Sequence, residues 1–413
     1  MKLLENGRLV TVLAISTISL STITIFKRYL EPRSILVGSL VGQNYISQSQ
    51  AYRDVLELVN LGSRVAGTPT NEEALAYLSL EYQKVGYETE VQSFTYPKFE
   101  DRGSSIVVNE NTVSGRALNG SPAASPTASI VVVPNLGRKE DFARIDVEGK
   151  IAIVKRGEIR FGDKASNAEA AGAVGLIIVN NAPDNFVGTL DREINIPVLS
   201  VSGKQGESLL QNIYDDSQTV TLRVDTVRRL VTGSNLIARR ANSTQPKVIV
   251  GGHYDSVLGS PGANDNASGT AVVLELARKL ARTPQADRVW FLAFDGEEDG
   301  LHGSKAFVNN ATPQFLSRLT GMINFDMVGI NNELTISGTS SLVKLVEKDS
   351  FLSKTKTMGG SDHIPFANAK VSVLFFTRGL DPNYHTPDDD EVNPQLLDET
   401  VEVGLKVTKQ LLE

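Results

Sequence analysis

The stretch GGHYDSVLGSPGANDNASG at residues 251–269 follows directly on the apolar run VIV at 248–250. Glycine, aspartate, asparagine, serine and proline reverse a chain, so this composition predicts a turn at the end of a buried strand. The stretch also carries His253, Asp255 and Asp265, whose side chains are metal-ligand types. Two interpretations follow: a plain turn, or a turn that presents a metal site at the end of a strand.

From about residue 232 to the end, apolar strand-like runs alternate with helical segments. The runs are SNLIARR, KVIVGG, RVWFLAF, GMINF and VSVLFF. In the helical segment TAVVLELARKLA, the residues Val273, Leu276, Ala277 and Leu280 recur at i, i+3, i+4 and i+7. This alternation predicts an α/β domain with a doubly wound, mixed but mostly parallel sheet and helices on both faces.

A β-rich segment with a different character precedes this domain. It contains the short runs SIVVV, GKIAIVKRG, VGLIIVNN, IPVLSVS and VTLRV and a single helical piece, KASNAEAAGA. Residues 48–96 predict two helices and a strand, a segment too small to fold alone. We therefore expect an α/β domain formed by residues 46–104 and 232–413, with a small β-rich domain, 105–231, inserted between the two parts.

The overall composition excludes several kinds of function. The 413 residues carry a net charge of −7, and no basic cluster stands out, so nucleic acid is not an expected partner. The chain has no cysteine, which excludes disulfides, thiolate metal sites and cysteine nucleophiles. Any metal must therefore bind imidazole and carboxylate groups.

The first 30 residues have a targeting pattern. Residues 9–26, LVTVLAISTISLSTITIF, are uncharged and have Lys and Arg on both sides. As a helix they would span roughly 27 Å, which barely crosses a bilayer. A retained membrane anchor, a cleaved signal and a buried helix all remain open. We expect an exported protein, either secreted or membrane-anchored with an extracytoplasmic catalytic domain.

Metal-ligand side chains follow each strand-like run of the α/β domain. Ligands bind beyond the carboxyl ends of the strands in such a sheet, so these groups are expected to converge. They are His253, Asp255, Asp265, Asp295, Glu297, Glu298, Asp326 and His385. So many carboxylates repel one another unless cations neutralise them. Two divalent ions would do so, and zinc suits these ligands, with cobalt or manganese as substitutes, in a two-metal hydrolytic site.

Six motifs, in order, resemble those of the zinc-dependent M28 peptidases. They are HYDS, GANDNASG, FDGEEDGLHGS, NFDMVG, SDHIPF and YHTPDDD. Residues 146–181 are similar to the protease-associated (PA) domain that many members carry, so the resemblance covers nearly all of residues 48–413. It implies peptide substrates, two zinc ions per chain and hydrolysis of the amino-terminal peptide bond.

The resemblance also implies the ligand set. His253 and Asp326 would hold one zinc, Glu298 and His385 would hold the other, and Asp265 would bridge the two. A hydroxide that bridges the metals would be the nucleophile.

Three further residues receive roles by the same resemblance. Glu297 would be the general base, taking a proton from the metal-bound water and passing it to the leaving amine. Tyr384 would donate a hydrogen bond to the developing oxyanion. Asp255 would orient His253 through the other nitrogen of its imidazole.

Nearby polar residues are predicted to lie outside the ligand set. Asp362 and His363 are expected near the site without direct ligation. Asp389 and Asp390 are interpreted as surface charge, and Asp388 as a candidate partner of a ligand.

Other functions stay open at this point. FDGEE, DHIPF and HTPDDDE also fit a single-zinc glutaminyl cyclase, an M28 relative, although the inserted domain and GANDNASG favour the peptidase. A carboxypeptidase or dipeptidase of the same family and a non-catalytic binding ectodomain are the remaining alternatives. The sequence decides neither the side-chain specificity nor the oligomeric state.

Overall fold

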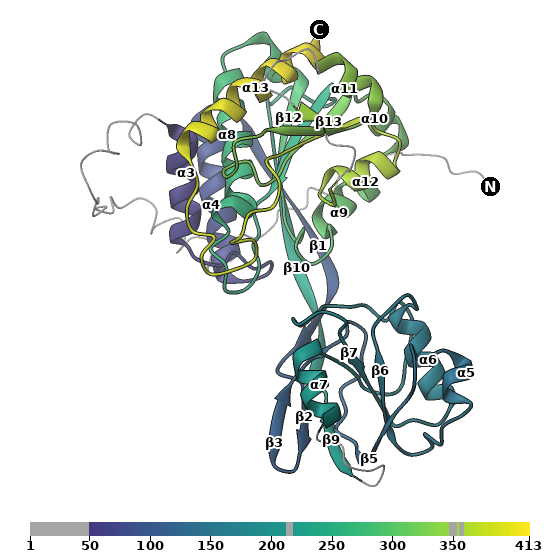
Figure 1. Ribbon diagram of the computed structural model, residues 1–413. Helices are drawn as coiled ribbons and strands as arrows, with labels where there is room; N and C mark the ends of the chain where they lie inside the picture. The colour runs from purple at the N-terminus through teal and green to yellow at the C-terminus, as the bar shows by residue number, and fades with distance from the viewer. Residues whose placement is uncertain (1–48, 212–217, 347–352, 355–358) are drawn as a thin grey trace, which may run out of the picture. The chain divides into compact units, whose positions relative to one another are not determined.

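The computed structural model describes residues 49–211, 218–346, 353–354 and 359–413. The chain forms two compact units, one made of Thr232–Glu413 with the described residues up to Tyr96, and the other of Pro97–Val231 (Figure 1). The predicted targeting segment 1–30 lies outside the described residues. Across the described residues, no helix combines the length and the apolar character that a membrane crossing requires.

The first unit contains an eight-stranded sheet with the order β1-β10-β12-β11-β13-β16-β14-β15. The strands are β1 (Glu88–Asp101), β10 (Thr226–Arg239), β11 (Val248–His253), β12 (Val289–Phe294), β13 (Gly321–Phe325), β14 (Thr335–Gly338), β15 (Ser353–Lys354) and β16 (Val373–Thr377). The central strands β12, β11, β13 and β16 pair in parallel, whereas β10 and β14 join them antiparallel. The predicted mixed, mostly parallel sheet is confirmed.

Helices cover both faces of this sheet (Figure 1). One core contains side chains of α3 (Gln50–Asn60), α4 (Pro69–Lys84), α8 (Gly269–Leu280), α11 (Ser340–Val346) and α13 (Pro394–Leu412). A second core contains side chains of α9 (His302–Asn310), α10 (Pro313–Ser317) and α12 (His363–Asn368). On β11, Val248 and Val250 pack into the first core and Ile249 into the second. Side chains of a strand alternate between faces, which explains the unbroken apolar run.

The second unit is the inserted β-rich domain. Its sheet has the order β3-β2-β9-β5-β6-β7-β8-β4, and β5 to β8 pair in parallel. The strands are β2 (Ser105–Val108), β3 (Asn111–Ser114), β4 (Arg116–Ala117), β5 (Thr127–Val132), β6 (Ile151–Lys155), β7 (Gly175–Val179), β8 (Val198–Val201) and β9 (Thr219–Arg223). The helices are α5 (Lys139–Phe142), α6 (Phe161–Ala170) and α7 (Gly203–Gln211). Two apolar clusters of its own hold this unit together.

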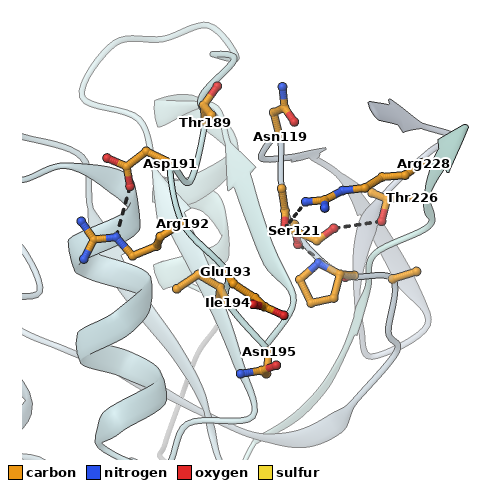
Figure 2. A pocket seen from close by; sticks show the side chains of 13 residues that line it. Asn119, Ser121, Thr189, Asp191, Arg192, Glu193, Ile194, Asn195, Thr226 and Arg228 are labelled. Carbon is orange, nitrogen blue, oxygen red and sulfur yellow. Dashed lines mark hydrogen bonds and ion pairs between the residues drawn. The ribbon is translucent and has the colours of Figure 1, made fainter. Parts of the chain in front are cut away.

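A polar groove of about 830 Å³ lies within the inserted unit (Figure 2). Segments 119–123 and 189–195 form it together with Thr226 and Arg228. Arg192, which lines the groove, pairs with Asp163 at 2.7 Å and with Asp191 at 3.2 Å. The inserted unit therefore has its own core and its own concave surface.

Candidate metal centre

The parallel register of the sheet brings the predicted site residues to one edge. His253, the last residue of β11, lies level with Phe294, the last residue of β12. Glu297 and Glu298 follow β12 within four residues, and Asp326 directly follows β13, the other neighbour of β11. Three strand ends therefore deliver four polar side chains to the same place.

The segment Ala263–Ser268 carries Asp265 and is attached to the end of β13. The side chain of Asn266 donates to the carbonyl oxygen of Phe325 at 2.9 Å. Its Oδ1 accepts the N–H groups of Gly269, at 2.9 Å, and Met327, at 3.2 Å. These bonds satisfy backbone groups at the beginning of α8 and the end of β13, which fixes the segment relative to Asp326.

Asp389 holds the same segment from the other side. Its carboxylate accepts the N–H of Asn264 at 2.7 Å and that of Asp265 at 3.1 Å. Asp389 is buried, whereas Asp388 is exposed. The prediction of surface charge is therefore wrong for Asp389, and Asp388 is not the partner. Three consecutive aspartates gave no signal that separates them, because only the fold turns one of them inward.

Arg64 was missed by the sequence analysis. Arg64 lies in the connection between α3 and α4, and its fully buried side chain donates to the carbonyl oxygens of Tyr254 at 2.7 Å, Gly262 at 3.0 Å and Pro261. Burial lowers the pKa of Arg64 to about 10, and carboxylates of the site, Asp255 first, oppose that shift. Arg64 thus holds both ends of the turn that links His253 to Asp265.

The structure brings all five predicted metal ligands together. Nε2 of His253 lies 3.3 Å from Oδ1 of Asp265 and 3.4 Å from Oδ1 of Asp326. Nε2 of His385 lies 3.1 Å from Oδ2 of Asp265 and 3.0 Å from Oε2 of Glu298. Asp265 therefore presents one carboxylate oxygen to each histidine.

The atoms of this cluster have unmet bonding capacity. Nε2 of His253, Oε1 of Glu298 and Oδ1 of Asp326 are buried and have no hydrogen-bond partner among the described residues. Ligand atoms of His253, Glu297 and Asp326 lie within 4.8 Å of one another, and so do those of His253, Asp265 and Glu298. Buried polar atoms without partners are costly, and imidazole and carboxylate are ligands that zinc accepts. The donor set fits divalent metal ions.

Proton affinities in the cluster are strongly shifted. Burial raises the pKa of Glu298 to about 7 and that of Glu297 well above its usual range. Burial opposes protonation of His385, yet its hydrogen bonds to Asp265 and Glu298 raise its pKa to about 10. Burial of the two glutamates and the carboxylates that contact His385 cause these pKa shifts, which are typical of functional sites.

Asp255 connects one histidine to the two glutamates. Its Oδ1 lies 3.5 Å from Nδ1 of His253, which is also 3.2 Å from the backbone carbonyl oxygen of Asp255. The carboxylate accepts the backbone N–H groups of Glu297 and Glu298, both at 3.2 Å. Asp255 therefore contacts Nδ1 of His253, whereas Nε2 of the same ring faces Asp265 and Asp326.

Two further buried carboxylates lie near the cluster. Asp295 accepts bonds from Asn71 at 3.0 Å and Ser234 at 2.8 Å and belongs to neither group of close ligand atoms. Asp362 is fully buried, and burial raises its pKa to about 7. Its neighbour His363 stacks on Phe375, with ring centroids 4.5 Å apart. Neither Asp362 nor His363 joins the close ligand groups within the described residues.

Tyr384 lies between the cluster and a cavity. Its ring stacks on His385 with centroids 3.7 Å apart, and it lines a cavity of about 480 Å³ together with Asp265, Glu297 and Asp326. Burial and then the charge of Asp265 raise the pKa of Tyr384, so its hydroxyl stays protonated at neutral pH. Glu297 and Tyr384, two of the three predicted catalytic residues, therefore line the same cavity, whereas Asp255 does not.

Known proteins share this arrangement of the chain. Residues 235–408 match the model of peptidase family M28, and residues 126–209 match the PA domain model. Aminopeptidase YwaD of Bacillus subtilis is 32% identical over 92% of this chain and 89% of its own length.

Two solved structures are similar over most of the chain. An aminopeptidase from Aneurinibacillus sp. strain AM-1 has a TM-score of 0.74 at 29% identity and covers 90% of this chain and 96% of its own. BSAP, a zinc aminopeptidase from Bacillus subtilis, has a TM-score of 0.71 at 29% identity over 86% of this chain and 93% of its own. The chain therefore belongs to peptidase family M28 and carries a PA domain, as its motifs predict.

Proposed function

We propose that this M28 peptidase is a zinc aminopeptidase, which hydrolyses the amino-terminal peptide bond of peptides at a centre for two zinc ions. One observation carries the proposal: Asp265 presents a separate oxygen to His253 and to His385. Asp326 accompanies the first histidine and Glu298 the second. The named relatives, a zinc aminopeptidase among them, support the same activity.

The ligands divide into two sets with one shared member. His253 and Asp326 would hold one zinc, Glu298 and His385 the other, and Asp265 both. Bound zinc would lower the pKa of a water molecule and polarise the carbonyl of the scissile bond. The unpartnered Nε2 of His253, Oε1 of Glu298 and Oδ1 of Asp326 support this assignment.

Glu297 would move the proton. It lines the cavity, and its backbone N–H donates to the carboxylate of Asp255, which fixes the position of the Glu297 backbone. Its carboxylate would take a proton from the attacking water and deliver it to the leaving amine.

Tyr384 would stabilise the oxyanion. Its hydroxyl is protonated at neutral pH and is a donor at the edge of the same cavity. A donor aimed at the developing charge stabilises the transition state more than the ground state.

The test combines metal content, turnover and substrate profile. Wild-type protein should bind two zinc ions and cleave aminoacyl-nitroanilides but not amino-blocked peptides. Glu297→Gln should keep both ions and lose about 10²–10⁴-fold in kcat, because it removes the proton acceptor without changing the volume. Tyr384→Phe should keep the ions and lose less.

Other outcomes would point to other functions. Cleavage of blocked peptides would reject the aminopeptidase, and ammonia release from a Gln-initiated peptide without bond cleavage would favour a glutaminyl cyclase. A protein that binds no zinc when zinc is supplied would favour a binding ectodomain. One zinc with full peptidase turnover would reject the two-metal part alone.

We further infer export, with residues 9–26 as a cleaved signal or a retained anchor. The uncharged run between basic flanks supports this inference. Cell fractionation with mass determination of the mature amino terminus tests it, and activity confined to the cytosol would reject it.

A further inference from the structure

The catalytic loop, residues 295–303, runs from the end of β12 into α9 and carries Glu297 and Glu298. The carbonyl oxygen of Glu297 accepts two backbone N–H groups of the loop, at 2.7 and 2.8 Å. The N–H of His302 donates to the carbonyl oxygen of Gly296 at 2.9 Å. The loop is therefore folded compactly on itself, and the contacts that hold it from outside set the position of both glutamates.

Tyr96 of β1 contacts the loop both before and after this pair of glutamates. Its side chain is buried, and its hydroxyl donates to Oδ2 of Asp299 at 2.6 Å. A Cβ added at Gly296 would lie 3.2 Å from the same hydroxyl, so the backbone just before Glu297 packs directly against it. The ring of Tyr96 also stacks on His302, with centroids 3.9 Å apart and an interplanar angle of 13°. One side chain thus reaches three positions of the loop.

The hydroxyl of Tyr96 is the donor in its bond to Asp299. Burial first, and then this hydrogen bond, raises the pKa of Tyr96, so the hydroxyl stays protonated at neutral pH. Because the acceptor is a carboxylate, the bond is charge-assisted and about twice as strong as one between neutral groups. A phenylalanine at this position would keep the stack on His302 and lose this bond.

The neighbouring strand β10 holds the two ends of the loop. The buried side-chain amide of Asn235 accepts the N–H of Asp295 at 3.1 Å and donates to the carbonyl oxygen of Gly303 at 2.8 Å. The N–H of Ser234 donates to the carboxylate of Asp295 at 2.8 Å. Asn235 also donates to Gln92 of β1 at 2.9 Å, which joins the two strands at this point. β10 therefore fixes where the loop begins and ends, and Tyr96 supports its middle.

We propose that Tyr96 is a positioning residue for the reaction, whose hydroxyl and ring hold the loop so that Glu297 reaches the attacking water and the leaving amine. The inference rests on the proposed aminopeptidase function and adds to it the last residue of β1 before the inserted unit. Proton transfer depends on where the base lies, and a displacement of about 1 Å can cost about 10²-fold in rate. Loss of the hydroxyl should therefore slow the chemical step and leave the binding of substrate and zinc intact.

The test measures kcat and KM for an aminoacyl-nitroanilide, together with the zinc content and the melting temperature of each variant. Tyr96→Phe should lower kcat by about tenfold, change KM by less than about threefold and keep the zinc content of wild type. Tyr96→Leu, which also loses the ring stacked on His302, should lower kcat further.

A double-mutant cycle isolates the bond between Tyr96 and Asp299. Asp299→Ala removes the acceptor of the same bond and should also lower kcat, whereas Asp299→Asn keeps an acceptor oxygen and should retain more of it. The variant that combines Tyr96→Phe with Asp299→Ala should lose no more than Asp299→Ala alone. Losses that multiply would show that the two residues act independently, and would overturn the inference.

Tyr87→Phe is the matched control, because Tyr87 is as buried as Tyr96 and donates to the carbonyl oxygen of Ala277 at 3.1 Å, outside the loop. It should lower the melting temperature and leave kcat unchanged. If Tyr96→Phe changes only the melting temperature, or only KM, the inference is overturned while the aminopeptidase stands. Wild type that binds zinc but turns over no aminoacyl-nitroanilide overturns the proposed function instead.

Discussion

Asp388 and Asp389 are neighbours in the sequence, but their side chains have different surroundings in the fold. Asp388 is exposed, whereas both oxygens of Asp389 accept backbone N–H groups of the segment that carries Asp265. Burial raises the pKa of Asp389 to about 6, although these two bonds favour its charged form. Asp389 thereby positions the proposed bridging ligand without belonging to the ligand set.

Asp389→Asn should weaken zinc binding by about 10–100-fold, as the loss of a residue that orients a ligand commonly does. Asparagine keeps the volume but replaces one acceptor oxygen with a donor, which opposes the N–H of Asn264 or Asp265. Competition with a chromogenic chelator measures the affinity. Asp388→Asn is the matched control and should bind zinc as wild type does; equal loss in both variants would contradict this role.

His363 is a buried imidazole, and in the part of the chain that the structure describes its ring nitrogens lack a close hydrogen-bond partner. Burial lowers its pKa from 6.5 to about 4. Between these values the unfolded chain binds more protons than the folded one, so the free energy of unfolding rises with pH across that window. The stability is complete above 6.5 and is lost progressively as the pH falls towards 4.

In zinc-free protein, this group should lower the free energy of unfolding by about 2 kcal/mol between pH 7 and pH 5. His363→Phe keeps an aromatic ring against Phe375 and should remove that part of the pH dependence. Urea unfolding of both proteins at the two pH values checks it. An identical decrease in wild type and variant would show that His363 does not titrate in this way.

At the scale of elements, Arg64 connects the beginning of the chain to the turn after β11. Its guanidinium reaches carbonyl oxygens at both ends of that turn, Tyr254 on one side and Pro261 and Gly262 on the other. The planar fork of arginine serves several acceptors at once, which a lysine ammonium at the end of a flexible stem does not.

Arg64→Lys should therefore lower the free energy of unfolding by about 1–3 kcal/mol for each carbonyl left without a partner. Arg53→Lys, on the exposed side of α3, is the control and should change it by less than about 0.5 kcal/mol. Denaturant titration compares the two. A similar small change in both variants would mean that water or lysine replaces the lost bonds.

The spacing of apolar residues predicted helices and strands well where those residues are buried in the core. The stripe of Val273, Leu276, Ala277 and Leu280 predicted α8, and all four side chains lie in the core. The strand runs of the α/β domain likewise appear as β10 to β13 and β16. The short strand β14 was not predicted. Thr335–Gly338 becomes a strand because it pairs antiparallel with β16, and the local spacing of apolar residues gives no sign of that pairing.

At the scale of the molecule, the two units have separate apolar cores. The proposed zinc ligands all lie in the unit that contains Thr232–Glu413, and none lies in Pro97–Val231. A metal that binds only the folded state stabilises the unit that holds it, by about 2.7 kcal/mol when its concentration is a hundred times the dissociation constant.

Removal of zinc by a chelator should therefore lower the melting temperature of one thermal transition and leave the other unchanged. Calorimetry with and without chelator measures this, and tryptophan fluorescence assigns the transition, because the only tryptophan of the chain, Trp290, lies in β12. Restoration by added zinc is the control. A shift of both transitions together would show that the two units unfold cooperatively.

The sequence by itself determined the family, the α/β architecture with its insert and the candidate ligands. Each of these depends on local spacing: apolar periodicity marks a strand or helix, and a strand end places the next polar residue at the sheet edge. His253, Asp265, Glu298, Asp326 and His385 were all found in this way or through the motifs they belong to.

Only the tertiary structure decided which residues support those ligands. Asp389 acts on a segment 124 and 125 residues away, and Arg64 reaches carbonyls 190 to 198 residues away. Both roles depend on which side chains are buried and where they point. The sequence alone does not specify this, because it is set only when distant segments pack together.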